Sequence, residues 1–178
     1  MPTDEELIRS ALEDSDAAFA ELVQRHKGRI FGMVSRFFAD SHQVDDIVQE
    51  IFIRAWRNLR KFRTEAPFEH WLSRIATHTC YDFLRKKQRG GTWVPIETHE
   101  TELADLPKSA AAEAREILGR AMQKLSPEEH LVITLAELEE KTVREIAVLT
   151  GWSESNVKVR AFRARQTLKK ILETSHER

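Results

Sequence analysis

The chain has 178 residues, of which 41% are hydrophobic and 32% charged, and its formal net charge is −1. These proportions indicate a soluble, helix-rich protein and exclude an intrinsically disordered one. No apolar run approaches the roughly 18 residues that a membrane-spanning helix needs, and the acidic, amphipathic start of the chain is unlike a signal peptide. A single cysteine, Cys80, excludes a framework of intrachain disulfides. We therefore expect a cytoplasmic protein.

The near-zero net charge conceals four blocks of alternating sign. Residues 1–53 and 91–140 are acidic, whereas residues 54–90 hold ten Lys or Arg against three Asp or Glu. Residues 141–178 hold nine basic residues against four acidic ones. Two basic blocks in a neutral chain predict two surfaces that contact a polyanion. The acidic blocks would face protein partners or cover the basic surfaces.

Apolar spacings of three and four residues predict helices throughout the first half of the chain. We expect them at about residues 4–13, 16–38, 44–61 and 67–87, with a turn at 41–45. Their apolar faces are sufficient for one compact helical domain, residues 1–89. Residues 90–109 then contain two glycines, two prolines and no helical period, which indicates a flexible acidic linker.

The helix predicted around residues 44–56 has two distinct faces. Its apolar stripe runs from Val44 to Trp56 and indicates a side committed to the core. The opposite face holds no Lys or Arg among its acids, and so forgoes the i,i+4 ion pairs that commonly solubilise a helix. Such a patch is either a solvated face or a docking surface, and the pattern alone leaves both open. It consists of Asp45, Asp46, Gln49 and Glu50.

Residues 110–178 predict a second helical domain that contains a helix-turn-helix. Ser126-Pro127 and the capping box Thr142-x-x-Glu145 mark helix starts. The turn Thr150-Gly151-Trp152 separates a short helix from a final one that ends near residue 172. The helix after such a turn enters the major groove of DNA, and we place Val157 and Ala161 inward. The outward residues of this recognition helix would be Glu154, Ser155, Asn156, Lys158, Val159, Phe162 and Arg163, with Arg160 and Arg165 suited to phosphates.

The basic block at residues 54–89 also contains interleaved aromatic residues. Basic and stacking groups together suit single-stranded or melted DNA, and the loop at residues 63–69 could hold a base flipped from the stack. The spacing of these aromatic residues fits the core face of a helix equally well, and for Trp71 the core interpretation is favoured. The basic segment at residues 85–89 is predicted to contact phosphates.

Three stretches give the chain a clear resemblance to the extracytoplasmic-function (ECF) group of bacterial alternative sigma factors. DAAFAELVQRH followed by VDDIVQEIFIRAW resembles the first conserved part of sigma domain two. FEHWLSRIATHTCYDFLRKK resembles the part of that domain that handles the minus-ten promoter element. EIAVLTGWSESNVKVRAFRAR resembles sigma domain four, which reads the minus-thirty-five element. The resemblance implies an all-α protein with domain two at 1–89, a linker at 90–109 and domain four at 110–178.

The resemblance also implies a role for each surface. The acidic patch Asp45, Asp46, Gln49 and Glu50 would dock on the coiled coil of the polymerase β′ clamp, and domain four would sit on the β flap. The minus-ten residues would be Arg63, Phe68, Trp71, Arg74, His78, Asp82, Arg85, Lys86 and Arg89. The minus-thirty-five residues would be Ser155, Asn156, Lys158, Val159, Arg160, Phe162 and Arg163. Position 78 is His where the family commonly has Asn, so we expect an atypical minus-ten preference.

The expected function is therefore that of a promoter-specificity subunit for stress-type transcription, with no catalysis, cofactor or metal. Its partners would be core RNA polymerase, promoter DNA and an anti-sigma factor. One alternative is a conventional helix-turn-helix regulator, which would bind duplex DNA tightly without polymerase. A second is a metal-dependent nuclease built on Asp45, Asp46 and Glu50. No second helix offers matching acids or histidines for that metal, and Cys80 reads as a small buried apolar residue.

Overall fold

The computed structural model describes residues 1–90 and 110–176, and all regular structure in these two ranges is helical. The all-α class predicted from the sequence is thereby confirmed for the described residues. The predicted linker lies, apart from Gly90, outside them. No helix in the two described ranges is both long enough and apolar enough to cross a membrane.

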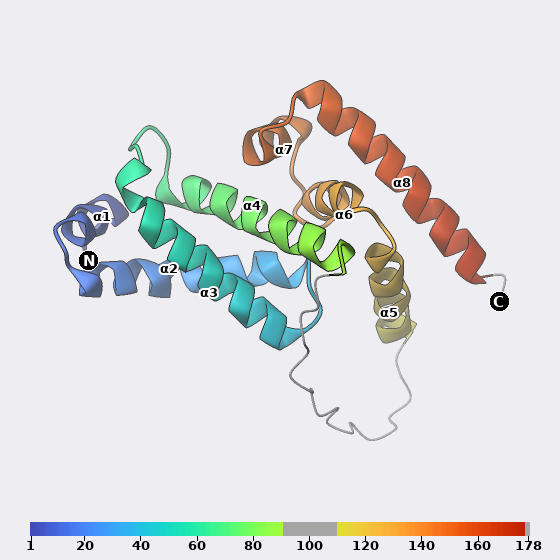
Figure 1. Ribbon diagram of the computed structural model, residues 1–178, viewed down its shortest axis with the longest axis horizontal. Helices are drawn as coiled ribbons and strands as arrows, with labels where there is room; N and C mark the ends of the chain where they lie inside the picture. The colour runs from blue at the N-terminus through green and yellow to red at the C-terminus, as the bar shows by residue number, and fades with distance from the viewer. Residues whose placement is uncertain (91–109, 177–178) are drawn as a thin grey trace, which may run out of the picture.

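Four α-helices and one short 3₁₀ segment form the N-terminal half (Figure 1). α1 (Asp4–Leu12) packs on α2 (Asp16–Ser35), and α2 packs on α3 (Ser41–Asn58). The 3₁₀ segment η1 (Leu59–Lys61) continues α3, and α4 (Phe68–Gln88) lies across both α2 and α3. The apolar stripes of these helices meet in a core whose largest fully buried side chains are Leu22, Ile30, Val34, Val44, Ile47, Ile51, Leu59 and Leu72.

Helix α3 begins three residues earlier than its apolar period suggests. Residues 41–45 were expected to form a turn, but Ser41 is already helical. The Asp40 side chain accepts hydrogen bonds from the backbone N–H groups of His42 at 2.8 Å and Gln43 at 3.2 Å. Because an N-cap of this kind satisfies backbone donors that the first turn leaves free, the helix extends back through polar residues that carry no periodic signal.

The C-terminal half contains four further helices and a π-helical segment. They are α5 (Ala110–Gln123), α6 (Pro127–Ile133), η2 (Thr134–Leu138), α7 (Val143–Thr150) and α8 (Glu154–His176). Both predicted helix starts are confirmed as capping boxes, at Ser126 with Glu129 and at Thr142 with Glu145. Figure 1 shows α8 as the long outer helix of this half, and α6 and α7 both pack on it.

The two halves pack against each other through α4, which contacts both α6 and α7. Buried apolar side chains from both halves form one continuous cluster, from Leu22 and Leu72 to Leu131, Leu135 and Ile146. The division of the chain into domains at residues 89 and 110 stays a prediction. What the structure adds is that helices 1–4 and helices 5–8 share a core in this conformation.

Candidate docking and nucleic-acid surfaces

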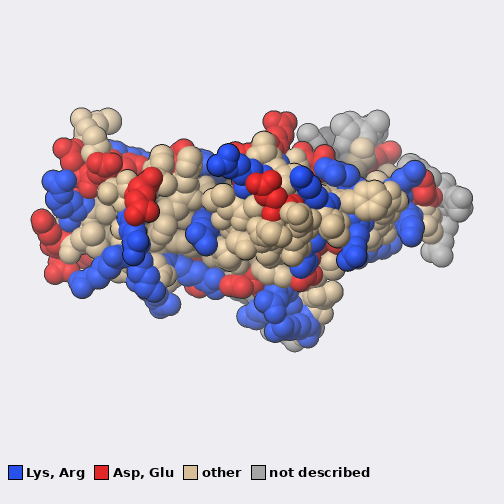
Figure 2. All heavy atoms as spheres, turned by 90° about the horizontal axis from the view of Figure 1, so that it is seen from above, with Lys and Arg blue, Asp and Glu red and all other residues tan. Residues whose placement is uncertain are grey.

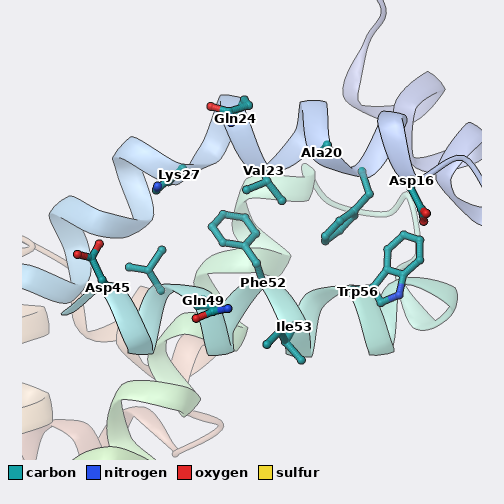
Figure 3. A pocket seen from close by; sticks show the side chains of 12 residues that line it. Asp16, Ala20, Val23, Gln24, Lys27, Asp45, Gln49, Phe52, Ile53 and Trp56 are labelled. Atoms are coloured by element: carbon teal, nitrogen blue, oxygen red, sulfur yellow. The ribbon is translucent and has the colours of Figure 1, made fainter. Parts of the chain in front are cut away.

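An open apolar groove of about 730 Å³ lies between α2 and α3. Figure 3 shows Phe52 and Trp56 of α3 turned toward Ala20 and Val23 of α2. Asp45 and Lys27 lie near one end of the groove and Asp16 near the other. The complete lining is Asp16, Phe19, Ala20, Val23, Gln24, Lys27, Asp45, Val48, Gln49, Phe52, Ile53 and Trp56.

Two of the groove's apolar side chains are substantially exposed, which the sequence did not reveal. Trp56 is 40% exposed and Ile53 37%, whereas the apolar stripe had placed Trp56 in the core. That placement is wrong because the stripe is wider than the face that α2 covers. The Trp56 ring instead packs on Phe19 with 4.7 Å between centroids. Exposed aromatic and aliphatic groups that share one concave surface typically mark a binding site.

The acidic patch of α3 is divided between two edges of the helix. Asp45 and Gln49 line the α2–α3 groove, while Asp46 and Glu50 lie on the opposite edge, beside α4. Glu50 accepts a hydrogen bond from Arg54 at 2.7 Å. The prediction that this face lacks i,i+4 ion pairs is therefore wrong for Glu50. Arg54 also donates to Asp82 of α4 at 2.7 Å. Of the four residues, therefore, only Asp45 and Gln49 border the groove.

The basic surface is built on α4 and the loop before it. Arg74, Asp82, Arg85 and Lys86 are exposed along this helix, as are Arg89 at its C-cap and Arg63 in the loop. His78 lies on the same helix, and burial, followed by the positive charge of Arg74, lowers its pKa below the ordinary value of 6.5. The imidazole is therefore neutral near pH 7, so that it can both donate and accept a hydrogen bond.

Two aromatic residues assigned to the minus-ten surface pack into the fold instead. Phe68 is only 4% exposed, and it contacts Phe62 edge-on at 5.6 Å. We therefore remove Phe68 from the DNA-facing set, because its period already marked it as a core position. Trp71 is half-buried against both Phe62 and Phe68, at 5.4 and 5.6 Å.

The predicted helix-turn-helix is formed by α7, the turn at Gly151 and α8. Gly151 has φ of +78°, and its N–H donates to the Ala147 carbonyl at 2.9 Å, which ends α7. A glycine is favoured here because side chains with a Cβ rarely adopt a positive φ. Val157 and Ala161 are buried as predicted, which turns the opposite side of α8 outward.

The outward face of α8 combines basic and apolar residues. Ser155, Asn156, Lys158, Val159, Phe162 and Arg163 are all exposed, and Phe162, at 64%, is among the most exposed apolar residues described. Arg160 is half-buried, with its guanidinium 4.3 Å from the centroid of the Trp152 ring. It also donates to the Asn156 side chain at 2.5 Å. In the view of Figure 2, Lys and Arg side chains are spread along the length of the molecule, with Asp, Glu and other residues between them.

Neither a metal site nor a reactive thiol is found in the described parts of the chain. Within residues 1–90 and 110–176, no three His, Cys, Asp or Glu side chains converge as metal ligands would. Cys80 is fully buried, and burial raises the pKa of its thiol well above the ordinary value.

Comparison with known families matches both halves of the chain. Residues 22–90 match the family model described as Sigma-70 region 2, and residues 115–168 match Sigma-70, region 4. The chain is 32% identical over 177 residues to the ECF RNA polymerase sigma-E factor of Escherichia coli K12, covering 93% of this chain and 92% of the relative. It is 28% identical over 181 residues to the RNA polymerase sigma-H factor of Pseudomonas aeruginosa, covering 96% and 94%.

Solved structures give the same picture of the fold. CnrH, in complex with the cytosolic domain of CnrY, is 29% identical and superposes with a TM-score of 0.60, covering 96% of this chain and 97% of CnrH. The sigma factor RpoE of Bartonella quintana, in complex with the anti-sigma factor NepR, has a TM-score of 0.59. At 19% identity, over 87% of this chain and 96% of RpoE, this second likeness concerns the fold alone.

Proposed function

Because this chain belongs to the ECF sigma factors, which direct RNA polymerase to promoters, we propose that its α2–α3 groove is the dock for core polymerase. Membership of that family sets aside the conventional regulator and the nuclease considered from the sequence. The partner in the groove would be the coiled coil of the β′ clamp. The observation that carries this proposal is the pairing of an exposed apolar floor with a polar rim that holds Asp16, Asp45 and Lys27.

The composition of the groove fits a helical partner. Its floor presents the side chains of Phe19, Ile53 and Trp56 from two helices, and a groove of this kind accepts the apolar face of an amphipathic helix. Asp45 and Gln49 at the rim would meet cationic or hydrogen-bonding side chains of that partner. Glu50 already accepts from Arg54, so it contributes less. Within the acidic patch, the proposal therefore ranks Asp45 and Gln49 above Asp46 and Glu50.

The test compares charge reversal at two adjacent residues on opposite edges of α3. We expect Asp45→Lys to weaken the affinity for core polymerase about tenfold, because a like charge placed at a complementary rim opposes association. Asp46→Lys is the matched control and should change that affinity less than about twofold. Equal losses for the two variants, with circular dichroism unchanged, would place the dock on the whole acidic patch and contradict the groove.

We further propose that α4 holds the minus-ten element. Its contacts would come from Arg63 in the preceding loop and from Trp71, Arg74, His78, Asp82, Arg85, Lys86 and Arg89. Capture of unstacked bases by such a surface offsets the few kcal/mol that unstacking costs and assists melting. A neutral His78 would present a donor and an acceptor to a base, which differs from the amide pattern of an Asn.

The minus-thirty-five element would be read by α8 through Ser155, Asn156, Lys158, Val159, Arg160, Phe162 and Arg163. Lys158 and Arg163 suit guanine edges, while Val159 and Phe162 suit the methyl group of thymine. Each DNA surface alone would bind weakly, and core polymerase would link them in one complex. Region four of the chain would meanwhile rest on the β flap.

An anti-sigma partner completes the proposal. CnrH was solved with the cytosolic domain of CnrY, and this likeness in sequence and fold leads us to expect a protein partner of that type here. We also propose the cytoplasm as the working compartment, since core polymerase and promoter DNA are there. The division into domain two at 1–89, a linker at 90–109 and domain four at 110–178 remains part of this proposal.

A further inference from the structure

The two DNA-reading helices, α4 and α8, lie too close together to bind both promoter elements at once. Elements at minus ten and minus thirty-five are about 25 base pairs apart, which is roughly 85 Å at 3.4 Å per base pair. In the structure, α4 and α8 are joined through a chain of side-chain contacts, none longer than 6.1 Å. The two DNA-reading helices must therefore separate before both elements can be bound.

Five side chains, which we name the Tyr81 cluster, join α4 to the C-terminal half. They are Tyr81 and Arg85 of α4, Glu128 of α6, Trp152 in the turn and Arg160 of α8. The Tyr81 hydroxyl donates to a Glu128 carboxylate oxygen at 2.5 Å. The Tyr81 ring meets the Trp152 ring edge-on at 6.1 Å. Arg85 lies 5.5 Å from the Tyr81 ring centroid, and Arg160 lies 4.3 Å from that of Trp152.

The chemistry of this cluster favours a closed pair. Burial, together with the Glu128 carboxylate, raises the pKa of Tyr81 to about 12, so its hydroxyl remains a donor at physiological pH. A hydrogen bond from a neutral donor to a charged acceptor is about twice as strong as a neutral pair. Arg85 and Arg160 belong to the proposed minus-ten and minus-thirty-five sets, and here each lies over a ring of the cluster.

Further contacts across the same interface support closure. Arg36, the C-cap residue of α2, donates to Glu139, which follows η2. Phe37, which follows α2, stacks on His130 of α6 with 6.3 Å between centroids. His78, proposed to read the minus-ten strand, lies close enough to the backbone of Leu149 in α7 for that backbone to influence its pKa. The closed arrangement thus engages His78 and Arg85, two of the groups that the minus-ten strand would need.

We propose that the Tyr81 cluster is an autoinhibitory latch that holds the free chain closed over its minus-ten surface. The proposal rests on the minus-ten role of α4 given above. In the free chain, the apparent affinity for the minus-ten strand equals the intrinsic affinity multiplied by the fraction of molecules whose latch is open. Core polymerase, by holding the two DNA-reading helices apart, would open the latch at the promoter.

The test opens the latch from the side that does not touch minus-ten DNA. The full-length double variant Glu128→Ala/Trp152→Ala removes the acceptor and the ring while leaving α4 unaltered. Phe31→Ala, an exposed aromatic outside the cluster, is the matched control. Small-angle X-ray scattering measures closure, and fluorescence anisotropy measures binding of a single-stranded minus-ten oligonucleotide without polymerase. Glu128→Gln alone is a milder variant that removes the negative charge and keeps an amide oxygen as acceptor.

We expect the double variant to have a larger radius of gyration and to bind the oligonucleotide about tenfold more tightly, because loss of a charge-assisted hydrogen bond is worth about that factor. Phe31→Ala should change neither quantity, and Glu128→Gln should move both part of the way. An unchanged radius with the fold intact would overturn the latch. A larger radius without tighter binding would overturn its inhibitory role.

One additional variant separates the latch from the proposed function. Arg74 lies outside the cluster but on the proposed minus-ten surface. In the opened double variant, Arg74→Ala should lower oligonucleotide affinity several-fold, as loss of a phosphate contact does. If the radius increases but Arg74→Ala has no effect, the minus-ten assignment of α4 is refuted, together with the inhibitory role that rests on it, while closure by the cluster stands.

Discussion

His130 should make the stability of this protein fall between pH 6.5 and pH 5. The side chain is only 7% exposed and stacks on Phe37 at the interface between the two halves. Burial, and then the positive charge of Lys87, lowers the pKa of His130 from 6.5 to about 4. Below pH 6.5 the unfolded chain therefore takes up a proton that the folded chain refuses, so stability is complete above pH 6.5 and decreases as the pH falls.

The magnitude follows from the width of this window. At 1.36 kcal/mol per pH unit, lowering the pH from 6.5 to 5 costs roughly 2 kcal/mol, and the full loss on reaching the folded pKa is roughly 3 kcal/mol. Ordinary carboxylates begin to protonate lower, with reference pKa values of about 3.9 to 4.3. The range from pH 7.5 to pH 5 thus separates the histidine from most acidic groups.

Urea denaturation at pH 7.5, 6.5, 5.5 and 5.0 would measure this effect against His130→Phe. Phenylalanine preserves an aromatic ring against Phe37 but cannot be protonated. The difference in unfolding free energy between the parent and His130→Phe should change by about 2 kcal/mol across this range. Since His78 and the other histidines are common to both proteins, their contributions cancel. If the two proteins lose equal stability between pH 7.5 and 5, the burial argument for His130 is refuted.

Two further predictions concern the helix-turn-helix. Gly151→Ala should lower the unfolding free energy by about 1 kcal/mol, because the position has φ of +78°, which a residue with a Cβ rarely adopts. An added Cβ would meet no neighbouring atom, so the loss would come from the backbone alone. Gly28→Ala within α2, which is equally unobstructed, should instead raise it by up to about 1 kcal/mol, and equal signs in calorimetry would contradict the backbone explanation. Phe162→Ala should reduce promoter-specific transcription by the holoenzyme several-fold through lost thymine-methyl contacts. Replacing the minus-thirty-five thymidines with deoxyuridine removes the same methyl groups, so it should reduce transcription by the parent holoenzyme by a similar factor. The same replacement should reduce transcription by the Phe162→Ala holoenzyme little further. If the losses from the protein and DNA changes are fully additive, this contact is contradicted.

Local signals in the sequence were sufficient for most of the helices. Ser126, followed by Pro127, and Thr142, with its capping box, cap helices as predicted, and Gly151 ends α7 where the turn was expected. These features are readable because the residues that interact are three or four positions apart. The early start of α3 at Ser41 was missed because its single cap residue, Asp40, adds no apolar period.

The sites were less predictable because they depend on which neighbour covers each face. Periodicity identified the apolar side of α3, but only the position of α2 shows that Trp56 lies in a groove outside the core. Likewise, Tyr81 was grouped with aromatics that suit nucleic acid, whereas its hydroxyl bonds Glu128, 47 positions away in the chain. Contacts at such separations depend on tertiary packing, which has no local pattern.

The complete burial of Cys80 makes its thiol unreactive in the folded protein, and this has a practical use. Its one thiol is fully enclosed on α4, the helix that joins the two halves. Alkylating reagents and oxidants can reach the sulfur only during a local opening, so the rate of modification reports how often that part of the fold loosens. The native protein therefore contains its own probe of slow local opening. A cysteine introduced on any outer face would react well before Cys80, so a dye could be attached at one chosen position without removing a natural residue.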